Sequence, residues 1–164
     1  MGRPFHDVIE ERVSRPAGMV DTAFLRSDEL PGRAAVGYVD DQGLRTNVFH
    51  LPVRGNGDGC IYTTAADVHE FWNALMNGRI VSPDTVAEMI RPRSEDPARS
   101  MRYGLGLWLD ASTDAVSLHG FDPGVGFVSV HDAANQQTYT VLSNKSRGAW
   151  PCSQRISSLL ADTF

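Results

Sequence analysis

The residue best placed for chemistry is His119, one of five histidines in the chain. It ends a predicted strand and opens Gly120-Phe121-Asp122-Pro123-Gly124, a segment that is predicted to be a turn. Side chains and backbone N–H groups at such a turn can face a cleft. The same pattern also fits a histidine that only closes a strand before a turn, so both interpretations stay open.

No metal centre and no common nucleophile motif accompanies this histidine. The histidines form no His-x-x-x-His pair, and Cys60 and Cys152 are too far apart in sequence for a zinc site. We therefore expect no metal, and we expect two separate buried thiols rather than a disulfide. The sequence Gly-x-Ser-x-Gly, which marks the nucleophile of many hydrolases, is absent.

A glycine-rich loop lies at residues 54–60, with glycines at 55, 57 and 59. It is not a P-loop because no Gly-Lys-Ser/Thr follows, and its spacing differs from the dinucleotide-binding fingerprint. The loop leads into a helix, so it either holds an anion at the helix N-terminus or serves as a plain connection. We expect no cofactor.

Four segments have the signals of a helix. Residues 4–13 carry apolar side chains at helical spacing without an evident cap, and Pro16 is predicted to stop this helix. Thr64 and Asp67 form the pattern of a capping box before a helix over 64–77. Serines are predicted to cap the other two helices, Ser82 for residues 83–90 and Ser153 for the last helix.

The remaining pattern is that of strands. A short strand is predicted at 34–39, residues 103–109 alternate large and small side chains, and further strands are predicted at 115–119, 126–131 and 138–143. The last two should form an antiparallel hairpin. This order predicts an α+β fold in a single domain over residues 1–164, with a mainly helical region at 1–97 and sheet strands plus a C-terminal helix at 98–164.

Composition limits the classes of partner. The 164 residues are 41% hydrophobic and 21% charged, as in one globular domain, and the net charge of −5 argues against nucleic acid as a partner. No run of about 18 apolar residues occurs, so we expect no membrane partner. The N-terminus has no apolar signal-peptide core, so we expect a cytoplasmic location for the chain as given.

Several segments occur in an order that a known family shares. Pro16-Ala17-Gly18-Met19-Val20-Asp21-Thr22 is similar to the turn "P-hydrophobic-G-M-x-D-T", and residues 59–68 are similar to "G-G-L-x-S-T-A-x-D-L". Gly37-Tyr38, Tyr103-Gly104-Leu105-Gly106, the segment 119–127 and Val141-Leu142-Ser143-Asn144 follow in the same order. Together they resemble the serine β-lactamase and penicillin-binding-protein family, in its class C-like branch of esterases and D-aminopeptidases. The resemblance implies a β-lactamase/transpeptidase-like fold.

The resemblance also implies a chemistry with three motifs. A Ser-x-x-Lys motif supplies the nucleophile, and a Tyr-x-Asn motif transfers protons. Neither is present, because Leu142 stands three residues before the single lysine, Lys145, and no tyrosine has Asn two residues later. The third motif, Lys-Thr-Gly or His-x-Gly, aligns with Leu118-His119-Gly120, where the histidine is displaced by one position. We therefore expect no catalytic residue in this chain, and we expect a substrate-binding segment made of Leu118, His119, Gly120, Phe121 and Asp122.

The family places the two missing motifs N-terminal to the matched region, and the opening helix has no evident cap. We therefore expect the C-terminal portion of a serine hydrolase that is inactive alone. The resemblance implies that the parent cleaves an ester or amide, either a small molecule or a peptide-like ligand, through an acyl-enzyme. It also implies that the strand at 118–121 supplies an oxyanion-hole N–H.

Two alternatives remain at this point. The chain could be a non-catalytic binding module that uses the cleft near His119, or it could be one half of a complementing pair. In either case the strand at 138–143 would be an unpaired apolar edge, so we expect pairing there with a second copy or with a complementing chain.

Overall fold

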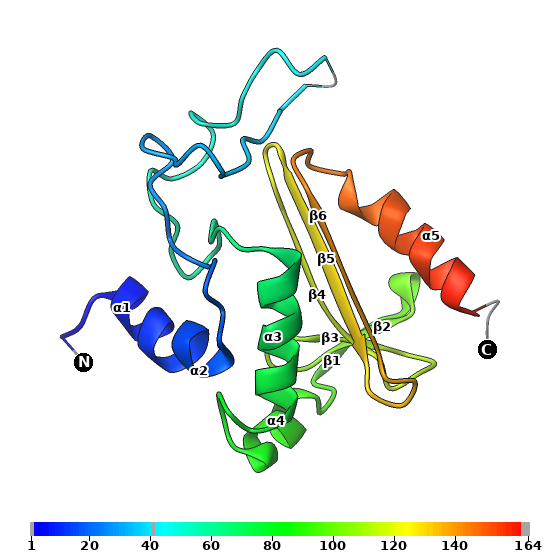
Figure 1. The fold of residues 1–164 in the computed structure, drawn as a ribbon. Helices are drawn as coiled ribbons and strands as arrows, with labels where there is room; N and C mark the ends of the chain where they lie inside the picture. The colour runs from blue at the N-terminus through cyan, green and yellow to red at the C-terminus, as the bar shows by residue number, and fades with distance from the viewer. Residues whose placement is uncertain (1, 41, 162–164) are drawn as a thin grey trace.

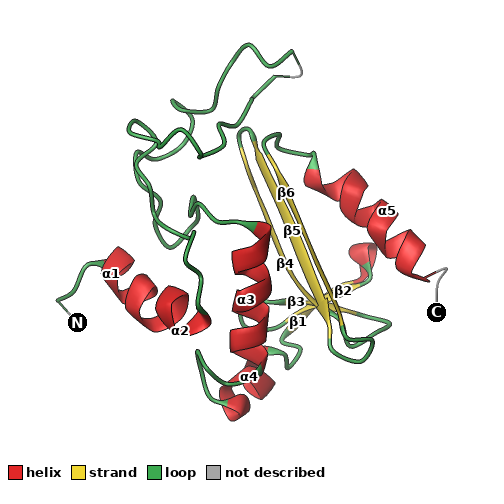
Figure 2. Cartoon of the chain, viewed as in Figure 1, coloured by secondary structure: helices red, strands yellow, loops and turns green. Residues whose placement is uncertain are grey.

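The computed structural model describes residues 2–40 and 42–161 (Figure 1). The chain forms an N-terminal helix, a long irregular segment, two helices, a six-stranded antiparallel sheet and a C-terminal helix. Helix α3 (Ala65–Met76) lies against one face of the sheet, and helix α5 (Ala149–Ala161) lies against the other (Figure 2). The predicted α+β class is confirmed.

The N-terminal helix is longer than predicted. It runs through α1 (Phe5–Ile9), a π-helical turn η1 (Glu10–Ser14) and α2 (Arg15–Ala17), so the prediction that Pro16 ends it is wrong. Pro16 is tolerated because it lies at the first positions of α2, directly after the π-helical turn, which widens the helix. Proline has no N–H group, so no backbone donor needs a partner at this position. The helix ends instead at Gly18, which has a left-handed φ of 78°.

No strand forms at residues 34–39, contrary to the prediction, and Tyr38 makes isolated bridges rather than a ladder. The backbone of this segment instead makes single bonds to two other segments. The N–H of Tyr38 bonds to the carbonyl of Asn144 at 2.9 Å, and the N–H of Val39 bonds to the carbonyl of Arg45 at 3.0 Å. The side chain of Asn47 adds to these bonds, since its Oδ1 accepts the N–H of Gly37 at 3.2 Å and its Nδ2 donates to the carbonyl of Pro123 at 3.1 Å.

The two middle helices begin at their predicted caps. Helix α3 follows Thr64, whose Oγ1 accepts the N–H of Asp67 at 3.1 Å. Helix α4 (Pro83–Met89) follows Ser82, whose Oγ accepts a backbone N–H of the first turn at 3.2 Å. Each cap satisfies one of the N–H groups that the first turn of a helix leaves unpaired.

The carboxylate of Asp67 does not complete the capping box in the expected way. Instead of reaching back to the cap, it accepts the N–H of Asp21 at 2.8 Å and the hydroxyl of Thr22 at 2.6 Å. Asp67 is buried, so this pair of bonds fastens the irregular segment to the start of α3.

The six strands follow one another in space as in sequence, and every neighbouring pair is antiparallel. They are β1 (Ser94–Asp96), β2 (Met101–Tyr103), β3 (Trp108–Asp110), β4 (Val116–Asp122), β5 (Val125–Asp132) and β6 (Gln137–Ser143). A short 3₁₀ turn, η2 (Pro97–Arg99), joins β1 to β2.

The long strands β4, β5 and β6 confirm the predicted ones, but the pattern at 103–109 is divided between two strands. The N–H of Gly104 bonds to the carbonyl of Leu107 at 2.9 Å, which closes a turn between β2 and β3. Strand β1 was not predicted, because its sequence Ser94-Glu95-Asp96 has no apolar alternation; such polar residues are typical of an edge strand.

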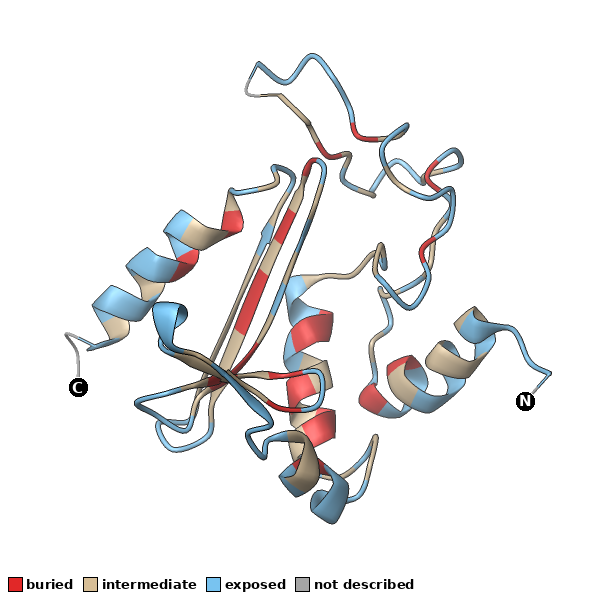
Figure 3. Ribbon diagram, turned by 180° about the vertical axis from the view of Figure 1, so that it is seen from behind, coloured by how far each residue is buried: buried red, intermediate tan, exposed pale blue. Residues whose placement is uncertain are grey.

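The main core lies between α3 and the sheet, and Figure 3 colours its residues on α3 as buried. Trp72 is fully buried, donates its Nε1–H to Ser129 at 2.8 Å, and stacks on His131 with ring centroids 5.4 Å apart. The buried members of this core are Val68, Trp72, Leu75, Val86, Leu107, Leu109 and Val116.

Helix α5 begins at Ala149 and not at the predicted cap, Ser153. Ser153 lies inside the helix on its buried side, where its hydroxyl is 3.2 Å from the hydroxyl of Tyr139 on β6. The serine therefore serves the contact between helix and sheet instead of the helix start. Within the described residues β6 pairs with β5 alone and forms one edge of the sheet.

Candidate functional site

The segment after His119 is strand rather than turn. Strand β4 continues to Asp122, which lies opposite Val125, so the turn consists of Pro123 and Gly124 alone. The fixed φ of proline suits the first central position of a type II turn, and Gly124, with φ 74°, suits the second. The predicted turn was therefore too long, and its first residues belong to the sheet.

The five predicted binding residues do not line one cleft. Side chains alternate along a strand, which places Leu118, Gly120 and Asp122 on the face toward α3, and His119 and Phe121 on the opposite face. Leu118 packs on the core beneath α3. The ring of His119 instead stacks on Trp108, with centroids 6.0 Å apart.

One side of β4 is open over this same segment. Strand β3 pairs with β4 only at Val116 and Ser117, and its chain then turns away at 104–107. Within the described residues, no named strand pairs with that side of β4 from residue 118 to residue 122. The sheet therefore has an exposed stretch of strand backbone beside α3.

The direction of the backbone groups along this stretch follows from the ladder. Alternate residues of an antiparallel strand direct their N–H and C=O groups to the same side. The N–H of Asp110 bonds to the carbonyl of Ala115 at 3.0 Å, so the odd-numbered residues direct these groups toward β3. Further along the strand, the N–H groups of His119 and Phe121 therefore face the open side.

A cysteine that the sequence did not connect with this site lies beside it. The Sγ of Cys60 is 3.7 Å from Oδ2 of Asp122, on the α3 face of the sheet. Cys60 has a left-handed φ of 66°, which a residue with a side chain rarely adopts. One feature of the sequence could have pointed to Cys60. It follows the glycine-rich loop and aligns with the second glycine of the motif "G-G-L-x-S-T-A-x-D-L".

The electrostatics make Cys60 a poor nucleophile. Partial burial raises the pKa of its thiol, and the neighbouring Asp122 carboxylate raises it further. The thiol is therefore protonated at neutral pH, and a thiol is far less reactive than a thiolate. Cys60 and Cys152 are separate free thiols, as predicted, but the prediction that both are buried is wrong, because Cys60 is half-buried and Cys152 is exposed.

The electrostatics also affect His119. Partial burial lowers the pKa of its imidazole, and the nearby Arg99 lowers it further. The ring is therefore neutral at pH 7, and it lies on the face away from α3. It therefore supplies no positive charge on the α3 face, where the neighbouring Leu118 lies.

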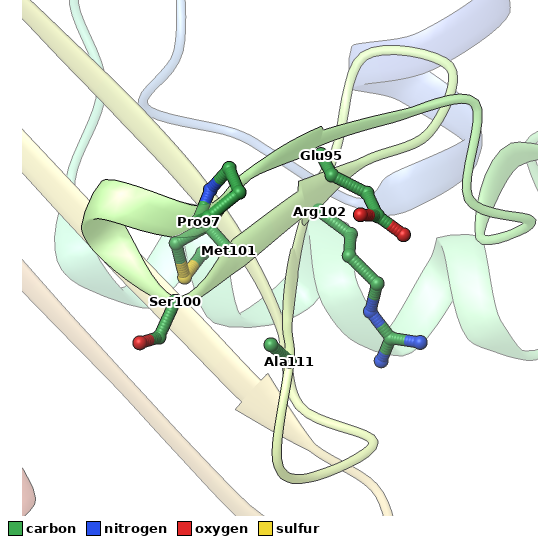
Figure 4. A pocket seen from close by; sticks show the side chains of 6 residues that line it. All are labelled: Glu95, Pro97, Ser100, Met101, Arg102 and Ala111. Atoms are coloured by element: carbon green, nitrogen blue, oxygen red, sulfur yellow. The ribbon is translucent and has the colours of Figure 1, made fainter.

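Two cavities lie at the other end of the sheet and include none of the five predicted residues. The one in Figure 4 has a volume of about 370 Å³ and is lined by Glu95, Pro97, Ser100, Met101, Arg102 and Ala111. Arg102 donates to the carbonyl of Asp110 at 2.7 Å, and its Nε is buried without a hydrogen-bond partner.

Residues 2–40 and 42–161 contain neither a cluster of metal-ligating side chains nor a membrane-spanning helix. No group of three or more His, Cys, Asp or Glu side chains in that part of the chain could hold a metal ion. None of the helices described there has both the length and the apolar character needed to cross a membrane.

Comparison with known proteins decides the family. The model of the family described as Beta-lactamase matches residues 1–156. The chain belongs to the beta-lactamase family. The resemblance found in the sequence motifs is therefore confirmed.

Curated relatives of this beta-lactamase-family chain are longer than the chain itself. It is 29% identical over 150 residues to "Putative penicillin-binding protein PbpX" of Bacillus subtilis, a match that covers 90% of this chain and 36% of the relative. It is 34% identical over 144 residues to "Protein Rv1367c" of Mycobacterium tuberculosis, which covers 74% of this chain and 36% of that protein. The chain thus spans about a third of the length of these relatives.

Solved structures give the same picture for the fold. A penicillin-binding protein from Bacillus halodurans matches with a TM-score of 0.88 and 32% identity, over 96% of this chain and 50% of that chain. The octameric penicillin-binding protein homologue from Pyrococcus abyssi matches with a TM-score of 0.72 at 21% identity, over 88% of this chain and 34% of that chain. A D-stereospecific amidohydrolase from Streptomyces sp. shares the fold with a TM-score of 0.68 at 21% identity, over 89% of this chain and 45% of that chain.

Proposed function

We propose that this chain is the C-terminal part of a serine hydrolase that cleaves an ester or an amide through an acyl-enzyme. The bond cleaved belongs to a small molecule or a peptide-like ligand, and the nucleophile and its base come from polypeptide outside these residues. The beta-lactamase family, the missing Ser-x-x-Lys and Tyr-x-Asn motifs, and the partial coverage of longer relatives support this proposal.

The observation that carries the proposal is the open backbone of β4. The N–H groups of His119 and Phe121 point to the side where no strand pairs. Fixed backbone donors at such a place can stabilise the negative oxygen that develops when a nucleophile attacks a carbonyl. In this role the chain contributes one donor to an oxyanion hole, and its side chains contribute no proton transfer.

Binding of the substrate is the proposed role of the residues around that donor. On the α3 face, Leu118 and Asp122 flank Gly120, which has no side chain to block an approach to the backbone. Leu118 offers an apolar contact, and Asp122 together with Cys60 offers polar atoms at the end of the strand. His119 and Phe121 are on the far face, so only their backbone is placed to act on the same ligand.

The test is active-site labelling with a fluorophosphonate and with a fluorescent penicillin. The chain alone should show no covalent labelling by intact-mass spectrometry. The chain joined to the preceding half of the Bacillus halodurans penicillin-binding protein should be labelled at the serine of Ser-x-x-Lys. Stoichiometric acylation of a serine in the chain alone would contradict the proposal, as would an unlabelled but folded joined protein.

A second candidate function is a free-standing, non-catalytic binding module, which the missing nucleophile motif favours. We propose cooperative unfolding as the discriminating observation. A module that acts as a single domain over residues 1–164 should unfold in one step as a monomer, with coincident transitions by circular dichroism and fluorescence. A non-cooperative transition would favour the incomplete hydrolase.

We also propose that β6 pairs with another chain, either a second copy or a complementing one. The strand is seven residues long, contains neither proline nor a charged residue, and exposes Leu142 at the sheet edge. Natural edge strands are commonly protected by charges or proline, and this one is not. Sedimentation should show association in the native chain and its loss in Leu142→Lys; a monomeric native chain would contradict self-pairing.

A further inference from the structure

The glycine-rich loop contains an asparagine that is followed directly by a glycine, Asn56-Gly57. The N–H of Asn56 bonds to the carbonyl of Gly59 at 3.0 Å, and the N–H of Gly59 bonds back to the carbonyl of Asn56 at 3.2 Å. These two bonds close a tight turn with Gly57 and Asp58 at its tip. Asn56, Gly57 and Asp58 are all exposed, so water reaches the side-chain amide and the backbone next to it.

An asparagine before a glycine can undergo a reaction that needs no enzyme. The backbone nitrogen of Gly57 attacks Cγ of Asn56, which closes a five-membered imide ring, and glycine favours this close approach because it has no Cβ. The proton of the Gly57 N–H passes through water to Nδ2 of Asn56, which leaves as ammonia when the Cγ–Nδ2 bond breaks. Water then opens the imide. If the bond between Cγ and the glycine nitrogen breaks, the product is aspartate; if the original peptide bond breaks, it is isoaspartate. The net reaction consumes water and releases ammonia, and nothing is oxidised or reduced.

The hydrogen bonds of this turn favour the attack. The Oδ1 of Asn56 accepts the N–H of Asp58 at 2.8 Å. Negative charge develops on that oxygen as the Gly57 nitrogen adds to Cγ, and a fixed backbone N–H directed at such an oxygen stabilises it. In the part of the chain that the structure describes, the N–H of Gly57 itself donates no hydrogen bond, so the attacking nitrogen is available.

A second Asn-Gly sequence, Asn77-Gly78, follows α3 and has both reacting groups engaged. The N–H of Gly78 donates to the carbonyl of Leu75 at 3.1 Å, and Nδ2 of Asn77 donates to the carbonyl of Asn73 at 2.7 Å. These bonds must break before the nitrogen can attack, and their net contribution corresponds to a reaction about tenfold slower. The fold therefore leaves one Asn-Gly pair open to attack and protects the other.

We propose that Asn56 is a site of spontaneous deamidation, which converts its side-chain amide into the carboxylate of aspartate or isoaspartate. The isoaspartate form lengthens the main chain by one carbon atom, so the two bonds between residues 56 and 59 cannot both keep their geometry. Cys60 follows directly, with its Sγ 3.7 Å from Oδ2 of Asp122. The modification thus loosens the segment that holds Cys60 against the end of β4, and it does so whether or not the chain belongs to a hydrolase.

The test incubates the folded chain at mildly alkaline pH and follows Asn56 and Asn77 by peptide mass spectrometry, which detects the change from amide to carboxylate. Asn56 should react about tenfold faster than Asn77. In urea the two rates should become similar, because neither the turn nor α3 is then present. Equal rates in the folded chain would overturn the proposal. An unchanged ratio in urea would also overturn it, because the neighbouring sequence and not the fold would then set the rates.

Two alanine variants of the same turn test the role of the attacking nitrogen. Gly57→Ala should slow the reaction at Asn56 by about tenfold, because a Cβ beside that nitrogen crowds the approach to Cγ. Neither Gly57 nor Gly59 has a left-handed φ, and a Cβ at Gly57 would meet only the ring of Phe5, at 3.8 Å. Gly59→Ala is the matched control, since its Cβ would meet only Oδ2 of Asp122, at 3.8 Å, and it should leave the rate nearly unchanged. Circular dichroism establishes that both variants fold, and equal rates in the two variants would contradict the proposal.

Hydrogen exchange tests the structural consequence separately. After incubation, the amides of residues 56–60 should exchange faster in the modified chain than in the fresh chain, because the two bonds of the turn are lost. Asn56→Gln has a longer side chain that does not form the five-membered ring, so the same incubation should leave its exchange unchanged. A modified chain that exchanges like the fresh one would overturn the loosening of the segment before Cys60.

Discussion

Replacing Asp67 by alanine should destabilise this protein more than any change to a surface charge. The Asp67 side chain is buried and accepts two hydrogen bonds, from the N–H of Asp21 and the hydroxyl of Thr22. Hydrogen bonds to charged groups contribute about 1.5–3 kcal/mol each. In Asp67→Ala the N–H of the exposed Asp21 can form a hydrogen bond to water, which offsets part of this loss of free energy. We therefore expect Asp67→Ala to lower the free energy of unfolding by about 3 kcal/mol.

Two companion variants separate the charge from the hydrogen bonds. Asp67→Asn keeps an acceptor oxygen of the same shape, so it should cost only about 1 kcal/mol. Asp28→Ala removes an exposed carboxylate paired with Arg26 at 2.8 Å, and such a solvent-screened surface pair contributes little to stability. The order of stability should therefore be native, then Asp28→Ala and Asp67→Asn, and last Asp67→Ala.

The assay is urea unfolding followed by circular dichroism and tryptophan fluorescence. With an m-value of about 2 kcal/mol/M, a loss of 3 kcal/mol lowers the midpoint by about 1.5 M. Domains of this kind have about 5–15 kcal/mol of stability in total, so the effect is easily resolved. The reasoning is refuted if Asp67→Ala and Asp28→Ala unfold at the same urea concentration, because the two bonds would then contribute nothing net.

Three further predictions concern the turn, the histidine and the thiols. Gly124→Ala should lower the free energy of unfolding by about 3 kcal/mol, because φ at this position is positive and the new Cβ would lie 2.8 Å from the backbone nitrogen of Tyr38. Gly106→Ala should lower it by only about 1 kcal/mol, because φ is positive there too but the space around the new Cβ is open. Urea unfolding measures both values, and equal losses would contradict the prediction. The pKa of His119 is lower in the folded than in the unfolded chain, so the stability it contributes is complete above about pH 6.5 and is lost as the pH falls through the folded-state pKa. In His119→Gln the urea midpoint should therefore depend less on pH below about pH 6.5 than in the native chain. The same pH dependence in both proteins would contradict the lowered pKa of His119. Exposed Cys152 should react with a thiol reagent faster than Cys60, whose pKa is raised, and single serine variants assign the two rates; a faster Cys60 would refute the neutral thiol.

The helices and the long strands could be predicted because their signals are local. Thr64 and Ser82 cap their helices by bonds to the N–H group three residues later, and the sequence shows both members of each pair. The buried positions Gly126 and Val128 of β5 alternate on the face that α5 covers, so the period of two is visible without any knowledge of the partners of the strand.

The predictions failed where distant residues decide the local structure. The strand expected at 34–39 does not form, and Tyr38 makes only isolated bridges to Thr46 and to the remote Lys145. Ser153 looks like a cap, yet Tyr139 of β6 engages it inside α5. The Asp67 carboxylate bonds to Asp21 rather than to its own helix. In each case the competing partner is remote in sequence or outside the local motif, so local propensity could not identify it.

The site shows the same limit with a consequence for chemistry. The five residues 118–122 were expected to bind one ligand because the segment resembles the third family motif, but strand geometry places neighbouring side chains on opposite faces. The imidazole of His119 therefore lies on the face away from α3, where it stacks on Trp108. Leu118, on the α3 face, carries no charge. The backbone N–H groups of β4 at residues 119 and 121 face the open side of the strand whatever side chains these residues carry. The absence of the side-chain motifs therefore does not remove these donors.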